Sequence, residues 1–213
     1  MTLEILDRAG VVVRRYSSRD AADLPVEGRN MPDYWIRPPL TMRVSPGLHR
    51  FVWDLRHPAP AVASYSYPIA AIAGGTPRTP QGTLVAPGTY TARLRVDGAE
   101  FTAPLVVRMD PRVKTPPAGL QLQYATSRAI DAALARVAAT LRDVQTAGGG
   151  ARAEAAKVSA TALTRAQGQA TQLFGQVEGA DLPPTAQLLA AWTETAAAID
   201  SAITAWERGR LEQ

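Results

Sequence analysis

The 213-residue sequence contains no cysteine and only two histidines. The lack of cysteine excludes disulfides, thiol nucleophiles and cysteine-bound metals. The histidines, His49 and His57, belong to no HExxH pattern, so a histidine-based metal site is not expected. A GxSxG motif is missing, and no glycine pair is followed by the lysine and hydroxyl residue of a phosphate-binding loop. These absences predict a chain with no cofactor, no metal and no catalytic residues.

Long apolar runs are missing too. No stretch approaches the roughly 18 consecutive apolar residues of a membrane-spanning helix, so no membrane span is predicted. The first residues, MTLEILDRAG, lack the basic and apolar regions of a signal peptide. By itself, this pattern leaves open a cytoplasmic protein or a fragment whose export signal lies upstream.

Lysine is nearly absent, since Lys114 and Lys157 are the only lysines among 23 basic residues. The net charge is +4, and its excess lies in residues 1–116, which hold 15 basic and 10 acidic residues against 8 and 9 in residues 117–213. The arginines are spread singly along strands and loops, unlike the clustered stripe of a phosphate-binding face. The sequence therefore predicts no nucleic-acid partner.

The hydrophobic period changes near residue 115, after the stiff connector DPRVKTPP. The period is two before this point and about three and a half after it. This change predicts two domains, residues 1–115 and residues 116–213, each long enough to form its own core.

Two hairpins are predicted in the first domain. TLEIL (2–6) and VVVRRY (11–16) flank a turn ending in a glycine, and GTYTARLRVD (88–97) is followed by a glycine and EFTAPLVVRM (100–109). In residues 88–97 the apolar side chains alternate with polar ones, so one face should be buried. That face is predicted to consist of Tyr90, Ala92, Leu94 and Val96.

Further strands are expected at residues 40–44, 48–55 and 68–73, which brings the total to about seven. In LHRFVWDL (48–55), Phe51, Trp53 and Leu55 should face the core, and His49 lies on the same side. We therefore predict an N-terminal immunoglobulin-like (fibronectin III-like) β-sandwich.

Two long proline-rich stretches, residues 20–39 and 58–88, should be irregular loops. They hold the candidate contact residues for a ligand or partner: Tyr34, Trp35, Tyr65 and Tyr67. The alternative is a structural role, in which these aromatic rings fill a small core beneath the loops.

The second domain is predicted to be an Ala-rich, antiparallel bundle of three helices, at about 119–146, 151–177 and 185–208. Gly168 and Gly175 either weaken the second helix or permit close approach of a neighbour. Among the large core side chains is Trp192, whose replacement by alanine should cost about 3 to 5 kcal/mol if its indole is buried.

Acidic residues offer little sign of catalysis. The sequence leaves open that Asp33 and Asp54 approach one another as a glycosidase pair, but solvated or turn-capping acids are the more ordinary interpretation. Asp7, Asp97 and Asp110 stand at strand ends without the spacing of a calcium loop.

The segments TLEILDRAGVVVRRYSS, YWIRPP, GLHRFVWDLR, YPIAAI, LVAPGTYTARLRVDG and VVRMDPRVKTP resemble the C-terminal region of bacterial sortilin-like, BNR (Asp-box) repeat proteins often labelled glycosyl hydrolases. GLHRFVWDLR and LVAPGTYTARL are also similar to the immunoglobulin-like domain of the flagellar hook-capping protein. The resemblance covers residues 2–116 and continues more loosely through VEGADLPPTAQ. It implies an extracytoplasmic (periplasmic or secreted) protein in which a β-propeller precedes this region. In that family the glycosyl hydrolase designation is attached to the propeller.

Three functional hypotheses follow from these observations. The first is a non-catalytic accessory module that packs against an upstream propeller or a protein partner. The second is a carbohydrate-binding module that uses the four loop aromatics. The third is a structural subunit of a larger extracytoplasmic complex, docked through its helices.

Overall fold

The computed structural model describes residues 1–22, 25–27, 29, 31–68, 72–146 and 151–211. The chain divides into two compact units. Unit 1 consists of Met1–Ala59 and Tyr65–Lys114, and unit 2 consists of Pro60–Ser64 and Thr115–Gln213. The chain therefore enters unit 2 twice, once as a five-residue segment and once as the helical half.

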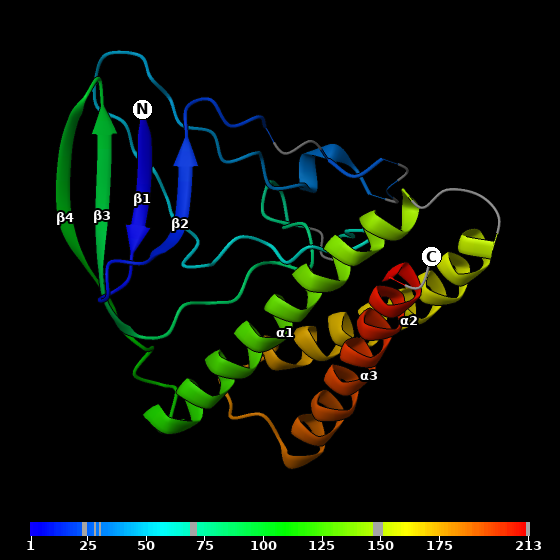
Figure 1. Cartoon of the computed structure of the whole chain (residues 1–213). Coiled ribbons are helices and arrows are strands. Elements are labelled where there is room, and N and C mark those ends of the chain that lie inside the picture. The colour runs from blue at the N-terminus through cyan, green and yellow to red at the C-terminus, as the bar shows by residue number, and fades with distance from the viewer. Residues whose placement is uncertain (23–24, 28, 30, 69–71, 147–150, 212–213) are drawn as a thin grey trace. The chain divides into compact units, whose positions relative to one another are not determined.

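Unit 1 contains a four-stranded antiparallel sheet in the order β2-β1-β3-β4 (Figure 1). Its strands are β1 (Thr2–Leu6), β2 (Val12–Ser17), β3 (Gly88–Val96) and β4 (Ala99–Val107). Both predicted hairpins are confirmed. The pairing of β1 with β3, which aligns Leu3 with Leu94, joins them into one sheet.

Local turn chemistry closes each hairpin. Between β3 and β4, Asp97 and Gly98 have φ angles of 49° and 87°, the left-handed pair that suits a two-residue hairpin. Between β1 and β2, Oδ1 of Asp7 accepts hydrogen bonds from the backbone N–H groups of Ala9 and Val11, both at 2.9 Å. Asp7 thus acts as a turn-capping acid.

The core of unit 1 includes Tyr90 and Ala92 of the face predicted for β3, whereas Leu94 and Val96 of that face are only partly buried and lie outside the core. Its buried residues include Ile5 and Tyr90, and Ala92 packs against them. On the opposite face, Arg93 donates from Nη2 to Glu4 at 2.7 Å, and the Glu4 residue is only 8% exposed. This ion pair keeps a buried carboxylate compensated.

The predicted strands at 40–44 and 48–55 are wrong, because both segments are irregular. Of residues 68–73, positions 69–71 lie outside the described part of the chain, and the remainder forms no strand. Leu55 has a φ of 59°, which breaks any extended run at that point. The described residues therefore form one four-stranded sheet and three α-helices, which makes this a mixed α/β chain. The second sheet of the predicted sandwich is not found among them.

Side chains from the irregular 48–55 segment nevertheless reach the sheet. The Phe51 ring lies edge-on to Tyr16 at 4.7 Å, and the Trp53 ring lies edge-on to Tyr90 at 5.9 Å. The predicted core positions are thus partly right. Leu55 is 39% exposed and His49 is exposed, so their predicted inward orientation is wrong.

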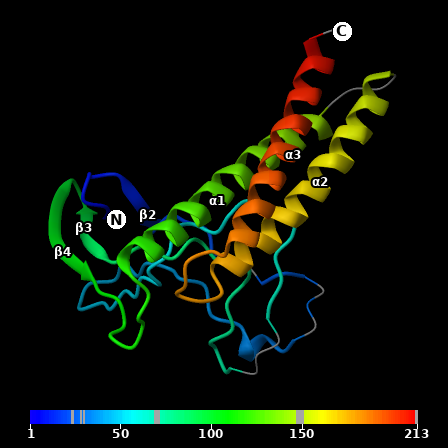
Figure 2. The same cartoon turned by 90° about the horizontal axis from the view of Figure 1, so that it is seen from below.

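The three predicted helices of unit 2 are confirmed as α1 (Pro117–Gln145), α2 (Ala151–Val177) and α3 (Ala186–Leu211). They lie side by side, with α2 running opposite to α1 and α3 (Figure 2). Residues 147–150, between α1 and α2, lie outside the described residues. Among the described helices, none is both long and apolar enough to cross a membrane.

Apolar stripes of all three helices form the core of unit 2, with the largest contributions from Ile130, Leu134, Leu163, Phe174, Ile199 and Trp206. Trp206 is 4% exposed, whereas Trp192 is only partly buried at the edge of this core. A Cβ added at Gly168 or Gly175 would meet nothing within 4 Å. These glycines therefore weaken α2 without permitting a close approach.

The five-residue segment Pro60–Ser64, here called the strap, belongs to the helical core despite its position in the first half of the sequence. Pro60 is fully buried, and Val62 packs against the core. The backbone N–H of Ala63 donates to Oε1 of Gln167 in α2 at 3.2 Å. The sequence pattern gave no sign of this placement, because the strap reads as part of a long loop.

Candidate ligand-binding cleft

Two of the predicted contact residues lie in the short helix η1 (Asp33–Trp35). The rings of Tyr34 and Trp35 stand edge-to-face at 5.8 Å. Tyr34 is 69% exposed. The backbone carbonyls of both residues accept hydrogen bonds, from the N–H groups of Gly74 and Thr76. The pair is therefore anchored by its backbone and presents one free ring to solvent.

The other two predicted residues have different surroundings. The guanidinium of Arg78 lies over the Tyr65 ring at 4.1 Å. The hydroxyl of Tyr67 accepts a hydrogen bond from the N–H of Val26 at 3.3 Å, and Tyr67 lines a cleft. Of the four aromatics, Tyr67 alone lines this cleft, so the predicted set does not form a single platform.

The cleft lies within unit 1 and has a volume of about 830 Å³. This size falls within the range of small-molecule sites, which combine apolar walls with a few convergent polar groups. The aromatic and apolar residues that line it are Pro25, Ile36, Pro38, Pro39, Leu40, Val52, Tyr67, Pro77 and Leu84. Its charged and imidazole groups are Arg14, Arg37, Arg56, Arg78, Asp33, Asp54 and His57.

A β-bulge places Arg14 at the cleft. In the register between β1 and β2, Ile5 pairs with Arg14 and Leu6 pairs with Val12, so Val13 is an extra residue. Bulges re-aim side chains in this way. As a result, Val13 joins the apolar core while the adjacent Arg14 lines the cleft.

The Arg14 side chain is held in a partly buried position. Its guanidinium carbon lies 5.0 Å from the centre of the Tyr16 ring, a cation–π arrangement. Nε of Arg14 and the hydroxyl of Tyr16 are buried and have no hydrogen-bond partner among the described residues. Burial raises the pKa of Tyr16, Arg14 opposes that rise and Asp54 adds to it. Unpartnered buried polar atoms of this kind are rare in proteins.

Another part of the cleft is formed by the residues on either side of Leu55, a non-glycine residue with left-handed backbone geometry. Such residues concentrate at functional sites. On either side of it, Oδ1 of Asp54 accepts from the N–H of Arg56 at 3.2 Å, and Nη1 of Arg56 donates to the carbonyl of Gly82 at 2.7 Å. The flanking Asp54 and Arg56 both line the cleft.

Gly82 is required by a close backbone approach. A Cβ at this position would lie 1.9 Å from the carbonyl oxygen of His57 and 2.5 Å from that of Pro58. The neighbouring N–H of His57 donates to the carbonyl of Thr83 at 2.9 Å. This wall is therefore a tight pairing of two chain segments, with buried His57 inside it.

The cleft brings together Asp33 and Asp54, the pair that the sequence left open. Arg29 forms an ion pair with Asp33, whose side chain is 81% exposed. Asp54 caps the turn at Arg56. The ordinary interpretation of these acids, solvated or turn-capping, therefore agrees with their surroundings.

The described residues that line the cleft include four arginines and two aspartates. Nη2 of Arg37 reaches only a backbone carbonyl, that of Gly75 at 3.4 Å. Within the described residues, no carboxylate lies at ion-pair distance from Arg14 or Arg37. Sequence reasoning missed these arginines, because they are scattered along the chain and only tertiary folding gathers them.

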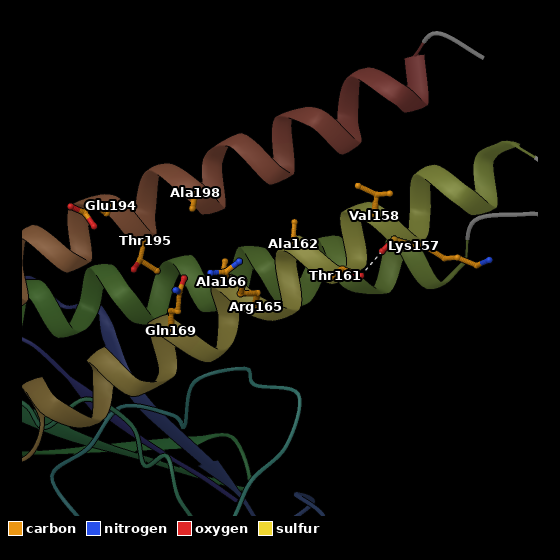
Figure 3. A pocket seen from close by; sticks show the side chains of 10 residues that line it. All are labelled: Lys157, Val158, Thr161, Ala162, Arg165, Ala166, Gln169, Glu194, Thr195 and Ala198. Atoms are coloured by element: carbon orange, nitrogen blue, oxygen red, sulfur yellow. Dashed lines mark hydrogen bonds between the residues drawn. The ribbon is translucent and has the colours of Figure 1, made fainter.

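A second concavity, of about 710 Å³, lies in unit 2 between α2 and α3. Figure 3 shows small side chains along it, including Ala162 and Ala166 of α2 and Ala198 of α3. Lys157 and Arg165 stand on the α2 side and Glu194 on the α3 side (Figure 3). We call this feature the α2–α3 groove.

No metal-binding cluster of histidine and carboxylate side chains is found in the described part of the chain. Comparisons with known proteins give no further guide to the cleft. No protein-family model, no curated protein and no solved structure matches this chain.

Proposed function

We propose that this chain is a non-catalytic binding module that holds a ligand in the cleft of unit 1. The observation that carries the proposal is the cleft itself, which proline rings and Tyr67 line together with several arginines. Concave sites with this mixture of apolar walls and few polar groups are typical of ligand binding.

A binding role fits the acids of the cleft better than catalysis does. A general acid near neutral pH depends on a desolvated carboxyl group. The Asp33 side chain is largely solvated and paired with Arg29, and the Asp54 residue is exposed and caps a turn. An assay panel that detects turnover, abolished by Asp54→Asn, would overturn the non-catalytic assignment.

The wider role we propose is that of an accessory module in an extracytoplasmic sortilin-like β-propeller protein. The support is the sequence resemblance over residues 2–116. The immunoglobulin-like assignment of unit 1 is part of this proposal and rests on the same segments together with the two paired hairpins. Under this proposal the partner of the module is an upstream propeller domain or a separate protein.

Carbohydrate is one candidate ligand, and unit 1 offers two alternative positions for it, each marked by one tyrosine. Tyr67 lines the cleft, whereas Tyr34 carries the exposed ring of the η1 pair. Exposed aromatic rings pack well against the C–H faces of sugars. Binding in the cleft would depend on Tyr67, and binding on the η1 surface would depend on Tyr34.

The test is an NMR titration of the ¹⁵N-labelled full chain with pools of oligosaccharides and peptides. We expect shift changes at Arg56, Gly82 and Tyr67, and loss of the response in Tyr67→Ala but not in Tyr34→Ala. The opposite pattern would move the site to η1. An absence of any change at the cleft, with all pools at millimolar concentration, would contradict the cleft proposal.

A structural subunit remains the third candidate, favoured by the α2–α3 groove. Helix bundles commonly dock partners on faces where small residues allow close approach. Cross-linking of the chain in extracts of the native host, with photo-reactive residues at Ala198 and at Gln172, tests this role. A partner captured from position 198 alone supports docking at the groove, and equal labelling from both positions counts against it.

A further inference from the structure

We infer that the cleft ligand is an acidic saccharide, a sugar chain that carries carboxylate or sulfate groups, and that Arg14 and Arg37 bind its oxyanions. This inference rests on the proposed binding role of the cleft. It adds the chemical class of the ligand and the residues that recognise it.

The charges of the described lining favour an anionic ligand. Asp33 is paired with Arg29, and among the described lining residues the carboxylate of Asp54 accompanies Arg14 and Arg37. Arg14 and Arg37 have no carboxylate partner in the described parts of the chain. Guanidinium groups of this kind attract anions, and their planar forks match the geometry of carboxylate and sulfate oxygens.

The surroundings of Arg14 suit a side chain that binds a ligand. An irregularity of the β1–β2 register brings this arginine to the core side of the sheet, next to Ile5. The Tyr16 ring lies beneath its guanidinium, while its buried Nε has no partner. A buried donor without a partner is costly in the empty protein. Because this Nε is shielded from solvent, a ligand would meet Arg14 through the other atoms of its side chain, which lines the cleft.

The backbone hydrogen bonds beside the cleft favour a saccharide over a peptide. A peptide bound as an added strand needs free backbone N–H and C=O groups. Where residues 55–57 pair with residues 83–85, such groups are already used, since Val85 donates to Leu55 and His57 donates to Thr83. The proline residues that line the cleft have no N–H to offer. Recognition therefore depends on guanidinium groups and ring faces, which suit a sugar acid.

Isothermal titration of the full chain with four probes tests the inference. The probes are a galacturonic-acid hexamer, the same hexamer as its methyl ester, a sulfated oligosaccharide and hexaglutamate. We expect the acidic hexamer, the sulfated chain or both to bind, and the uncharged ester to bind at least roughly tenfold more weakly, the size of one lost charge-assisted hydrogen bond. Binding should weaken as NaCl is raised.

Arginine variants provide the matched control. Arg37 and Arg43 are both exposed, but only Arg37 lines the cleft. We expect Arg37→Ala to weaken binding about tenfold and Arg43→Ala to change it less than about twofold. Arg14→Lys, which keeps the charge and removes the planar guanidinium fork, should also weaken binding, and Arg37→Ala covers the case in which the Arg14 variant does not fold.

The outcomes separate this inference from the proposed function. Equal binding of the acid and its ester, with shifts at the cleft, would overturn the acidic-ligand inference and leave the binding module intact. Equal loss in Arg37→Ala and Arg43→Ala would show general electrostatic attraction and overturn the assigned residues. Binding of hexaglutamate alone would make the ligand an acidic peptide. No binding of any probe would overturn the inference, and the oligosaccharide and peptide pools would then decide the proposed function by themselves.

Discussion

The backbone N–H of Ala63 donates to Oε1 of Gln167 at 3.2 Å, although the two residues are 104 positions apart. The Gln167 residue is 4% exposed, so this amide is a buried polar group satisfied by the strap. Pro60 is fully buried at the start of the same segment. The strap is therefore part of the helical core and not a passive stretch of loop.

Replacing Gln167 by leucine should destabilise unit 2. The substitution keeps the approximate side-chain volume but leaves the Ala63 N–H without its acceptor, which costs about 1 to 3 kcal/mol when the group is buried. Urea unfolding followed by circular dichroism at 222 nm measures the loss. The control is Gln172→Leu, on the exposed side of the same helix. Unchanged amide exchange at Ala63 in the Gln167 variant would show that this bond does not hold the strap.

Gly82→Ala should distort the cleft. Its Cβ would overlap the His57 carbonyl, so the backbone must move, and overpacking of this kind costs about 1 to 3 kcal/mol. Gly88→Ala is the matched control, because its Cβ would make only ordinary contacts, with the Tyr90 ring at 3.8 Å and the Ala86 carbonyl oxygen at 4.0 Å. Amide spectra should show changes at His57 and Thr83 in the first variant and not in the second. Retention of the wild-type spectrum in Gly82→Ala would contradict the tight pairing of this wall.

Gly168→Ala and Gly175→Ala should each stabilise α2 by roughly 0.5 to 1 kcal/mol, because alanine restricts the unfolded chain and open space surrounds both positions. Gly119→Ala should bring no such gain. Its Cβ would meet Thr115 at 3.1 Å and Pro183 at 3.3 Å. Thermal unfolding of the three variants measures the difference, and a destabilised Gly168→Ala would indicate a neighbour at that face.

The two tryptophans of α3 should differ in their contributions. Trp206 is buried at 4% exposure, so Trp206→Ala should cost about 3 to 5 kcal/mol, whereas Trp192→Ala should cost less because Trp192 is only partly buried. The indole N–H of Trp206 has no partner among the described residues. Trp206→Phe should therefore be milder than Trp206→Ala. Urea unfolding of the three variants checks this order, and equal losses at 192 and 206 would contradict it.

Asp131 should make unit 2 less stable as the pH rises from about 4 toward neutral. Burial raises the pKa of this carboxyl, Arg128 opposes the rise and Glu178 adds to it. Because the folded pKa lies above that of the unfolded chain, the stabilising contribution is full at low pH and is lost as the pH rises through the folded pKa.

Carboxyl ¹³C titration should give Asp131 a midpoint above that of an unfolded aspartate, and Asp131→Asn should remove this part of the pH dependence. The ion pair with Arg128 competes with burial at this site. A midpoint below the ordinary aspartate value would show that the ion pair dominates instead.

Local sequence determined much of this protein. Alternating side chains and turn residues determined both hairpins, because those interactions span only a few positions, and of the predicted buried face Tyr90 and Ala92 reach the core. Heptad spacing fixed the three helices to within a few residues. At Phe51 and Trp53 the pattern identified side chains that contact the core, although the backbone between them is irregular.

Only the tertiary structure decided the candidate site. Of the predicted aromatics, Tyr67 alone lines the cleft, while Arg14, Arg37, Arg56 and Arg78 come from distant loops and a bulged strand. Nothing in the spacing of single arginines specifies that they converge. The strap, the left-handed Leu55 and the close approach at Gly82 likewise depend on long-range packing. The hydrophobic period of a sequence indicates which side chains will be buried away from water. A polar cleft depends instead on where distant segments meet once those side chains are buried, and the period does not contain that information.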